Sequence, residues 1–149
     1  MISNLPMYIN AIFIATTLLS IFLFYKATKK SKNTLVLLFA WIIFQAALGI
    51  SGFYTITNGF PPRFVIVALP ALLFIIALFL TDRGKAYLDN LDTKALTILH
   101  IVRIPVELCL YWLFLHKAIP KLMTFEGRNF DIIAGITTPF IFYFGSLAS

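Results

Sequence analysis

Five apolar stretches, separated by short polar segments, constrain what this chain can fold into. Each is close to the ~20 residues with which an α-helix crosses ~30 Å of hydrocarbon. None alternates apolar with polar residues, so the pattern does not fit a transmembrane β-barrel. Every backbone polar group in lipid must be paired inside the chain, which leaves the helix as the spanning element. The stretches are Met7–Tyr25, Leu35–Phe53, Phe64–Leu80, Ala95–Leu115 and Ile132–Ala148.

The composition excludes the soluble classes of protein. Of the 149 residues, 60% are hydrophobic and only 12% are charged, whereas soluble domains are about 25% charged. The aromatic content of 16% excludes a disordered chain, and the single cysteine excludes a disulfide scaffold. The loops are too short to hold another domain. We therefore predict an all-α fold, a polytopic transmembrane helical bundle of about five spanning helices that forms a single domain over residues 1–149.

The basic residues predict how the chain is oriented. Met1–Asn10 contains no Lys or Arg, and the first apolar stretch is followed by Lys26, Lys29, Lys30 and Lys32. This order is the reverse of a cleaved signal peptide and is typical of a retained anchor. If these lysines face the cytoplasm, the cytoplasmic loops contain more Lys and Arg than the outer loops, as the positive-inside rule requires. We expect an integral protein of the bacterial cytoplasmic membrane with its N-terminus outside.

The C-terminal end of the sequence leaves two expectations open. The last stretch runs to Ser149 without a basic residue that would anchor it at the interface. The chain is then either a fragment of a longer bundle or ends natively against other helices. The expected partners are the lipid bilayer and either another membrane subunit or a second copy in a homo-oligomer. Orientation and anionic lipid account for the net charge of +6, so no nucleic acid is expected.

Two charged residues, Arg103 and Glu107, lie inside the fourth stretch. A charged side chain at bilayer depth costs at least ~2.5–3.5 kcal/mol, so such residues face the bundle interior or a cavity. Their spacing of four places them within ion-pair reach on one helical face, which His100 and Tyr111 share at ~100° per residue. Pro105 is expected to kink the helix. We predict an intramembrane polar site of His100, Arg103, Glu107 and Tyr111.

Polar residues elsewhere are candidates to face this site. Gln45 lies beside small residues in the second stretch, and Asn10 and Thr17 share a face of the first, so these three are candidate cross-helix partners. Ordinary helix packing is the simpler interpretation. The loop before the fifth stretch is either a solvated segment with a helix cap at Asn129 or Asp131 or a lid over the bundle. The lid candidates are His116, Glu126, Arg128 and Asp131.

No cofactor or metal is predicted. His100 and His116 would lie about 24 Å apart along a helix axis, so they cannot bind one haem iron. A haem would need a ligand from a partner or from further sequence, which leaves it a minor alternative. Cys109 and His116, about 10 Å apart, are too distant for one metal ion. Motifs for nucleophilic and phosphate chemistry are absent, so an enzyme is not favoured.

Three functional hypotheses follow from the predicted site. In the first, it handles a proton, an ion or a small polar solute, in transport or sensing, with Glu107 as the titrating group and Arg103 beside it. In the second, the chain is a structural or accessory membrane subunit whose polar helix stripe docks a partner. In the third, it is a membrane enzyme or a haem-linked electron carrier.

Overall fold

The computed structural model describes residues 5–53 and 65–147. The structure is 81% helix, and no strand occurs in the described residues, which confirms the all-α prediction. Contacts divide the chain into two compact units. The first combines Met1–Lys29 with Asp92–Ser149, and the second is Lys30–Leu91. The single bundle expected from the sequence stays a prediction, and each unit is described by itself.

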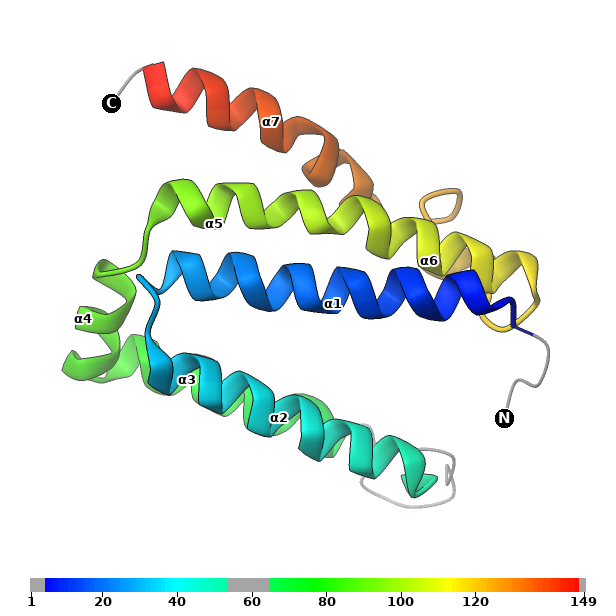
Figure 1. Ribbon diagram of the computed structural model, residues 1–149, viewed down its shortest axis with the longest axis horizontal. Helices are drawn as coiled ribbons and strands as arrows, with labels where there is room; N and C mark the ends of the chain where they lie inside the picture. The colour runs from blue at the N-terminus through cyan, green and yellow to red at the C-terminus, as the bar shows by residue number, and fades with distance from the viewer. Residues whose placement is uncertain (1–4, 54–64, 148–149) are drawn as a thin grey trace. The chain divides into compact units, whose positions relative to one another are not determined.

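The first unit is built on one long helical rod. Helix α5, the 3-10 turn η2 and helix α6 follow one another without a gap over Thr93–Leu115, which we call the central rod. Helices α1 and α7 pack against it (Figure 1). The elements of this unit are α1 (Met7–Ala27), α5 (Thr93–Leu99), η2 (His100–Val102), α6 (Arg103–Leu115), the 3-10 turn η3 (Lys121–Met123) and α7 (Asp131–Leu147).

Helix α1 runs antiparallel to the central rod, and one contact at each end fixes this arrangement. At the end of α1, the carbonyl of Ala27 accepts a hydrogen bond from the Asp92 N–H at 2.8 Å. At its beginning, the Tyr8 ring meets the Trp112 ring edge to face, with centroids 5.3 Å apart. Such aromatic pairs add ~0.5–1.5 kcal/mol to the area they bury. The two helices therefore lie side by side over most of their length.

Pro105 explains why the central rod changes its helical form. It has no N–H to donate to the carbonyl of Ile101 one turn earlier, and its ring crowds that turn. The preceding residues His100–Val102 adopt the tighter 3-10 form, in which the N–H of Arg103 bonds to the carbonyl of His100. This 3-10 turn lies at the level of the predicted polar residues, and the kink expected from Pro105 stays a prediction.

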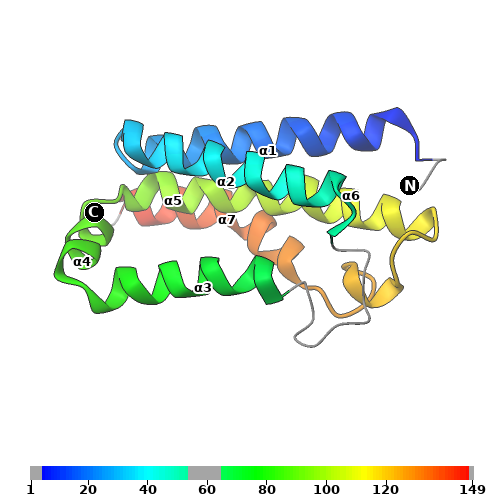
Figure 2. The same ribbon diagram turned by 90° about the horizontal axis from the view of Figure 1, so that it is seen from below.

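Helix α7 begins beside the middle of the central rod and not at its end. Asp131, its first residue, contacts Arg103, which lies ~15 Å from one end of the rod and ~18 Å from the other at 1.5 Å per residue. Residues 117–130, which we call the returning segment, therefore fold back along α6 before α7 starts. From there α7 lies beside α5 (Figures 1 and 2). The approach is close at Gly135, where a Cβ would lie 2.8 Å from Ile104 Cγ1.

The second unit contains α2 (Lys32–Ile50), α3 (Val65–Leu80) and α4 (Asp82–Asp89). Thr81 caps α4 by accepting the N–H of Gly84 at 3.1 Å. Gly84 is buried against the backbone of Leu78, which leaves no room for a Cβ in this turn. The hydroxyls of Thr34 and Tyr87 lie 3.1 Å apart and link α2 to α4. The apolar pattern did not predict α4, because the helix is short and polar.

Three helices are long and apolar enough to cross a membrane, in agreement with the first, second and fourth predicted stretches. Helices α3 and α7 contain shorter apolar stretches, Ala68–Leu80 and Asp131–Gly145. Phe64 and Ala148, which bound the predicted third and fifth stretches, lie outside the described residues, as does Ser149. The three long helices are Met7–Ala27, Lys32–Ile50 and Thr93–Leu115.

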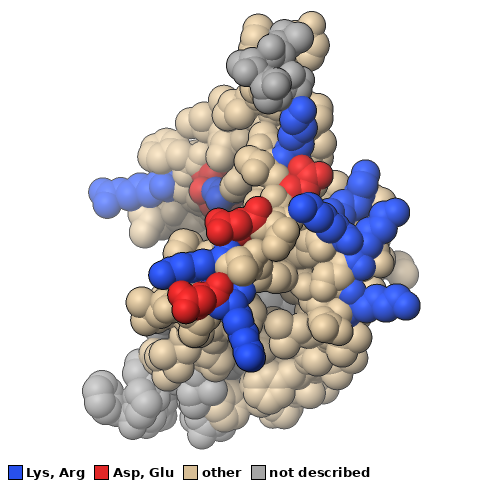
Figure 3. Space-filling view, turned by 90° about the vertical axis from the view of Figure 1, so that its left-hand side faces the viewer, with Lys and Arg blue, Asp and Glu red and all other residues tan. Residues whose placement is uncertain are grey.

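The lysines that carry the orientation prediction are all exposed. They are Lys26, Lys29, Lys30 and Lys32, in the segment where α1 ends and α2 begins. Lys29 and Lys30 have φ angles of 52° and 63°, in the left-handed region that non-glycine residues seldom adopt. Figure 3 shows Lys and Arg side chains projecting from the face that it displays, with Asp and Glu among them.

Candidate functional site

A cavity of about 340 Å³ lies in the first unit, where α1, the central rod and the beginning of α7 meet. Three of the four residues predicted for the polar site line it, namely His100, Arg103 and Glu107. Apolar side chains complete its wall. The lining residues are Ser20, Leu99, His100, Val102, Arg103, Val106, Glu107 and Asp131.

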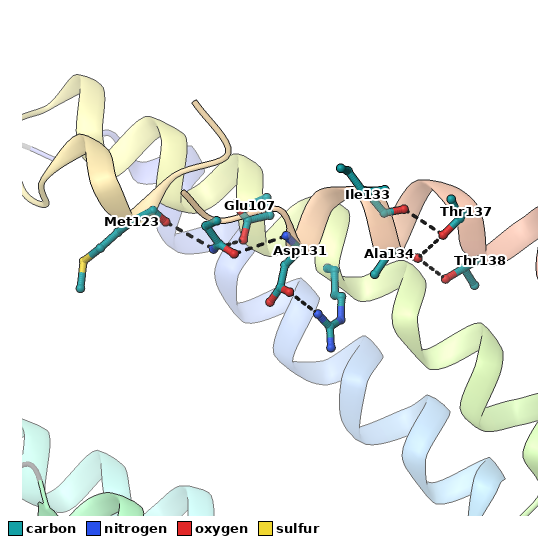
Figure 4. Close-up of polar contacts among 9 residues, drawn as sticks. Glu107, Met123, Asp131, Ile133, Ala134, Thr137 and Thr138 are labelled. Atoms are coloured by element: carbon teal, nitrogen blue, oxygen red, sulfur yellow. Dashed lines mark hydrogen bonds and ion pairs between the residues drawn. The ribbon is translucent and has the colours of Figure 1, made fainter. Parts of the chain in front are cut away.

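Glu107 is the most deeply buried charged residue that the structure describes, at 1% exposure. It lies in the second turn of α6, and its Oε1 accepts a hydrogen bond from Asn129 Nδ2 at 2.5 Å. Its Oε2 is buried and has no hydrogen-bond partner among residues 5–53 and 65–147. Burying a carboxylate is costly unless its oxygens are satisfied. Glu107 therefore keeps one acceptor unused inside the protein (Figure 4).

Asn129 joins Glu107 to the segment that leads into α7. Its Nδ2 also lies 3.4 Å from the carbonyl oxygen of Met123, and its Oδ1 accepts the N–H of Asp131 at 3.3 Å. Asn129 thus bonds to the first backbone N–H of α7, and its role as the helix cap stays a prediction. The contact of the same side chain with Glu107 was not predicted, because nothing in the sequence relates two residues so far apart in the chain.

Arg103 forms its ion pair with Asp131, and the two residues come from different helices. Arg103 Nη1 lies 2.5 Å from Asp131 Oδ1, and the side chains are 38% and 57% exposed. Asp131 is also in the first turn of α7, where a carboxylate is stabilised by the helix dipole. An ion pair between Arg103 and Glu107 is not formed in the described part of the chain. The spacing of four allows such a pair but does not require it when a carboxylate from α7 lies closer.

Tyr111 lies away from the cavity. Its ring packs on Phe125 of the returning segment, with centroids 5.0 Å apart, and on Phe114 at 6.4 Å. His100, at the other end of the predicted stripe, is exposed at the edge of the cavity. The four residues predicted to share one polar face therefore do not all line the cavity. Tyr111 belongs instead to an aromatic cluster.

Helix α1 contributes a polar residue that the sequence analysis did not single out. Ser20 lines the cavity, and its hydroxyl donates to the carbonyl of Thr16 at 2.8 Å. Thr17 bonds to the carbonyl of Phe13 within its own helix, and Asn10 is exposed. Ser20 could have been found from the sequence, because it lies three residues after Thr17 and therefore close to it on the surface of the helix. Gln45, the third predicted partner, belongs to the second unit.

Of the four lid candidates, Asp131 alone lines the cavity. His116 Nδ1 lies 2.8 Å from the carbonyl oxygen of Trp112 one turn earlier. Glu126 pairs with Lys121 at 3.5 Å inside the returning segment. Arg128 is exposed, and its backbone N–H donates to Leu122. These three residues hold the returning segment or face outward.

The residues around the cavity offer no ready metal centre. In the part of the chain that the structure describes, no three His, Cys, Asp or Glu side chains come together as ligands. Cys109, on the same helix as Glu107, is 3% exposed and belongs to the buried hydrophobic residues. The site offers carboxylate and hydroxyl oxygens beside one guanidinium group, which suits hydrogen bonding and charge pairing.

Comparisons with protein-family models, with curated proteins and with solved structures find no match for this chain. Its function is therefore argued from the site.

Proposed function

We propose that this chain is a multi-pass integral membrane protein that uses the cavity beside Glu107 to handle a proton, an ion or a small polar solute, in transport or sensing. In this proposal all five apolar segments cross the bilayer, and the N-terminus faces outward. The bilayer is the bacterial cytoplasmic membrane. The proposal rests on the carboxylate of Glu107. This residue is 1% exposed and lies in a helix long enough to span a membrane, and its Oε2 has no hydrogen-bond partner among the described residues.

The depth of the polar groups supports this proposal. If the central rod spans the bilayer, Arg103 lies near its midplane, and Asp131 is at the same level. Ionisable residues at such depth are rare and mark solute or proton pathways by default. The cavity also brings polar groups from α1 and α7 to this level, which a single amphipathic helix would not do.

The returning segment fits a fifth crossing of an unusual kind. Residues 117–130 run beside α6 to the middle of the rod, and α7 continues from there. Non-helical backbone at membrane depth is tolerated where it is buried in protein or lines a cavity. Thr124 in this segment is fully buried, and its hydroxyl donates to the Lys121 carbonyl. The charged residues Lys117, Lys121, Glu126 and Arg128 are exposed, so this crossing requires a water-filled cavity or a protein neighbour beside them. A crossing made of a loop and a helix is also how several transporters build midplane sites.

The accessory-subunit hypothesis has less support. It requires that the polar stripe of α6 be available to a partner, but Glu107 is turned inward and bonds to Asn129 of its own chain. Arg103 is likewise engaged by Asp131. The charged residues of the stripe are therefore used within the first unit.

The test is flux in liposomes that contain the purified chain and a pH-sensitive dye. A potassium gradient with valinomycin drives proton entry, and sodium and potassium gradients are run in parallel. We expect Glu107→Gln to lower the flux at least tenfold, because an amide cannot exchange a proton or carry the charge. Glu126→Gln is the matched control, since Glu126 is exposed and pairs with Lys121. Flux no greater than in empty liposomes would overturn transport, and an unchanged Glu107→Gln flux would overturn the role of Glu107.

A further inference from the structure

We propose that the cavity binds a small organic cation with an N–H donor, of the primary alkylammonium class. This deepens the proposed function and rests on it, because it names the solute of the same cavity. In the bound state an ammonium N–H bonds to Glu107 Oε2, and the alkyl part lies against the apolar wall.

The charges of the site favour a cationic guest. Arg103 is offset by Asp131 at 2.5 Å. Glu107 adds a second carboxylate that forms no ion pair among the described residues, while the amide of Asn129 that contacts it is neutral. With Glu107 ionised, the carboxylates of the lining exceed its guanidinium by one negative charge. A buried charge of this kind is stabilised by a partner of opposite sign.

Two of the oxygens that line the cavity, on Glu107 and Ser20, are acceptors with unused capacity. Oε2 of Glu107 accepts no bond in the described residues. Ser20, on the facing helix, already donates its hydroxyl hydrogen to the Thr16 carbonyl, so its oxygen is left as an acceptor. A guest that satisfies these two oxygens must bring donors, and an ammonium group has them.

The walls and the size of the cavity favour an organic cation over a bare metal ion. Leu99, Val102 and Val106 supply apolar surface, which offers a metal ion no ligands but stabilises a short alkyl chain. The described residues hold no group of three His, Cys, Asp or Glu side chains placed as metal ligands. The volume of about 340 Å³ lies in the range of small-molecule pockets, ~300–1,000 Å³.

The experiment measures binding to the purified full chain in detergent by isothermal titration calorimetry. The probes are n-butylammonium, tetramethylammonium, which has a charge but no N–H, and n-butanol, which has the alkyl chain but no charge, all at constant ionic strength. We expect saturable binding of n-butylammonium that is at least tenfold tighter than that of the other two. Glu107→Gln should weaken it at least tenfold, and Glu126→Gln should leave it unchanged.

A second variant keeps the test valid if Glu107→Gln does not fold. Ser20→Leu fills the cavity from α1 without altering Glu107. With methylammonium added as a fourth probe, this variant should weaken n-butylammonium binding more than methylammonium binding. Equal affinity for n-butylammonium and tetramethylammonium, or unchanged binding in both variants, would overturn the organic-cation proposal. Glu107-dependent proton flux without selective amine binding would overturn this proposal alone and leave the proposed function standing. Selective amine binding without any flux would overturn transport and leave the binding site standing.

Discussion

Two cavities of similar volume, one in each unit, differ in what lines them. The cavity of about 340 Å³ in the first unit contains Arg103, Glu107 and Asp131. The cavity of about 330 Å³ in the second unit is lined by apolar side chains from α2 and α3 alone. Its residues are Leu37, Leu38, Trp41, Pro70, Ala71 and Phe74.

The difference shows what turns a gap between apolar helices into a site. Both regions contain a proline within a helix, Pro105 in α6 and Pro70 in α3. In the first unit, a segment from outside the helix pair reaches the gap and brings Asn129 and Asp131 to the buried charge. The helices that line both cavities are apolar, so the polar partners from the third segment distinguish the two regions. Four predictions test this comparison.

The largest effect is expected from placing a carboxylate in the apolar cavity. Leu38→Glu places a charge among apolar side chains, where the Trp41 indole N–H is the one side-chain donor of the lining residues, so it should lower the free energy of unfolding by roughly 2.5–3.5 kcal/mol. The measurement is unfolding of the purified chain by titration of a denaturing detergent. Leu38→Gln, with the same shape and no charge, should lose less. Equal losses in the two variants would contradict a charge effect.

Removal of the donor to Glu107 should have the next largest effect. Asn129→Ala leaves both carboxylate oxygens without a partner, which should destabilise the first unit by about 3 kcal/mol. Asn90→Ala is the control, because Asn90 is exposed and its side chain bonds to the Ala86 carbonyl of its own helix, and it should change stability by about 0.5 kcal/mol or less. Similar losses in the two variants would show that Glu107 does not depend on this amide.

Close packing at the start of α7 gives a smaller effect. Gly135→Ala places a Cβ 2.8 Å from Ile104 Cγ1 and 3.2 Å from the Ile104 N, so it should destabilise by about 2 kcal/mol. Gly49→Ala in α2 meets nothing within 4 Å and should be stabilising by up to ~1 kcal/mol through helix propensity. Thermal unfolding in detergent compares the two. A stabilising Gly135→Ala would show that α7 does not approach the rod this closely.

The smallest effect is the coupling between Arg103 and Asp131. Both side chains are more than a third exposed, and exposed ion pairs contribute about 1 kcal/mol or less. A double-mutant cycle with Arg103→Ala, Asp131→Ala and both together measures the coupling from unfolding in detergent. A coupling near zero would mean that water screens the pair fully. A value well above 1 kcal/mol would place the pair in a medium less polar than water.

The sequence predicted the long helices well and the partners of the site poorly. Length and hydropathy suffice for α1, α2 and the central rod, because spanning helices need only a run of apolar residues. The short helix α4 was missed, although Thr81 followed by Asp82 is an N-cap signal. The sequence analysis predicted a loop there, because α4 is rich in charged residues and contains no apolar run.

Within the site, local spacing grouped His100, Arg103 and Glu107, which line one cavity, but it did not give their contacts. Asn129 and Asp131 approach the rod through the fold of the returning segment, which no periodicity encodes. Helical spacing also placed Tyr111 on the same face. The returning segment instead supplies Phe125 as its ring partner.

The two contacts at the start of α7 have a consequence for how the first unit assembles. Asn129 and Asp131 are two residues apart, and they hold Glu107 and Arg103, one helical turn apart on the rod. Once either contact forms, the other pair meets at an effective concentration that a short connection raises to the millimolar range or above. The contacts should therefore form and break together. The carboxylate of Glu107 then has its donor only when the start of α7 is docked, so the site is complete only while these contacts hold.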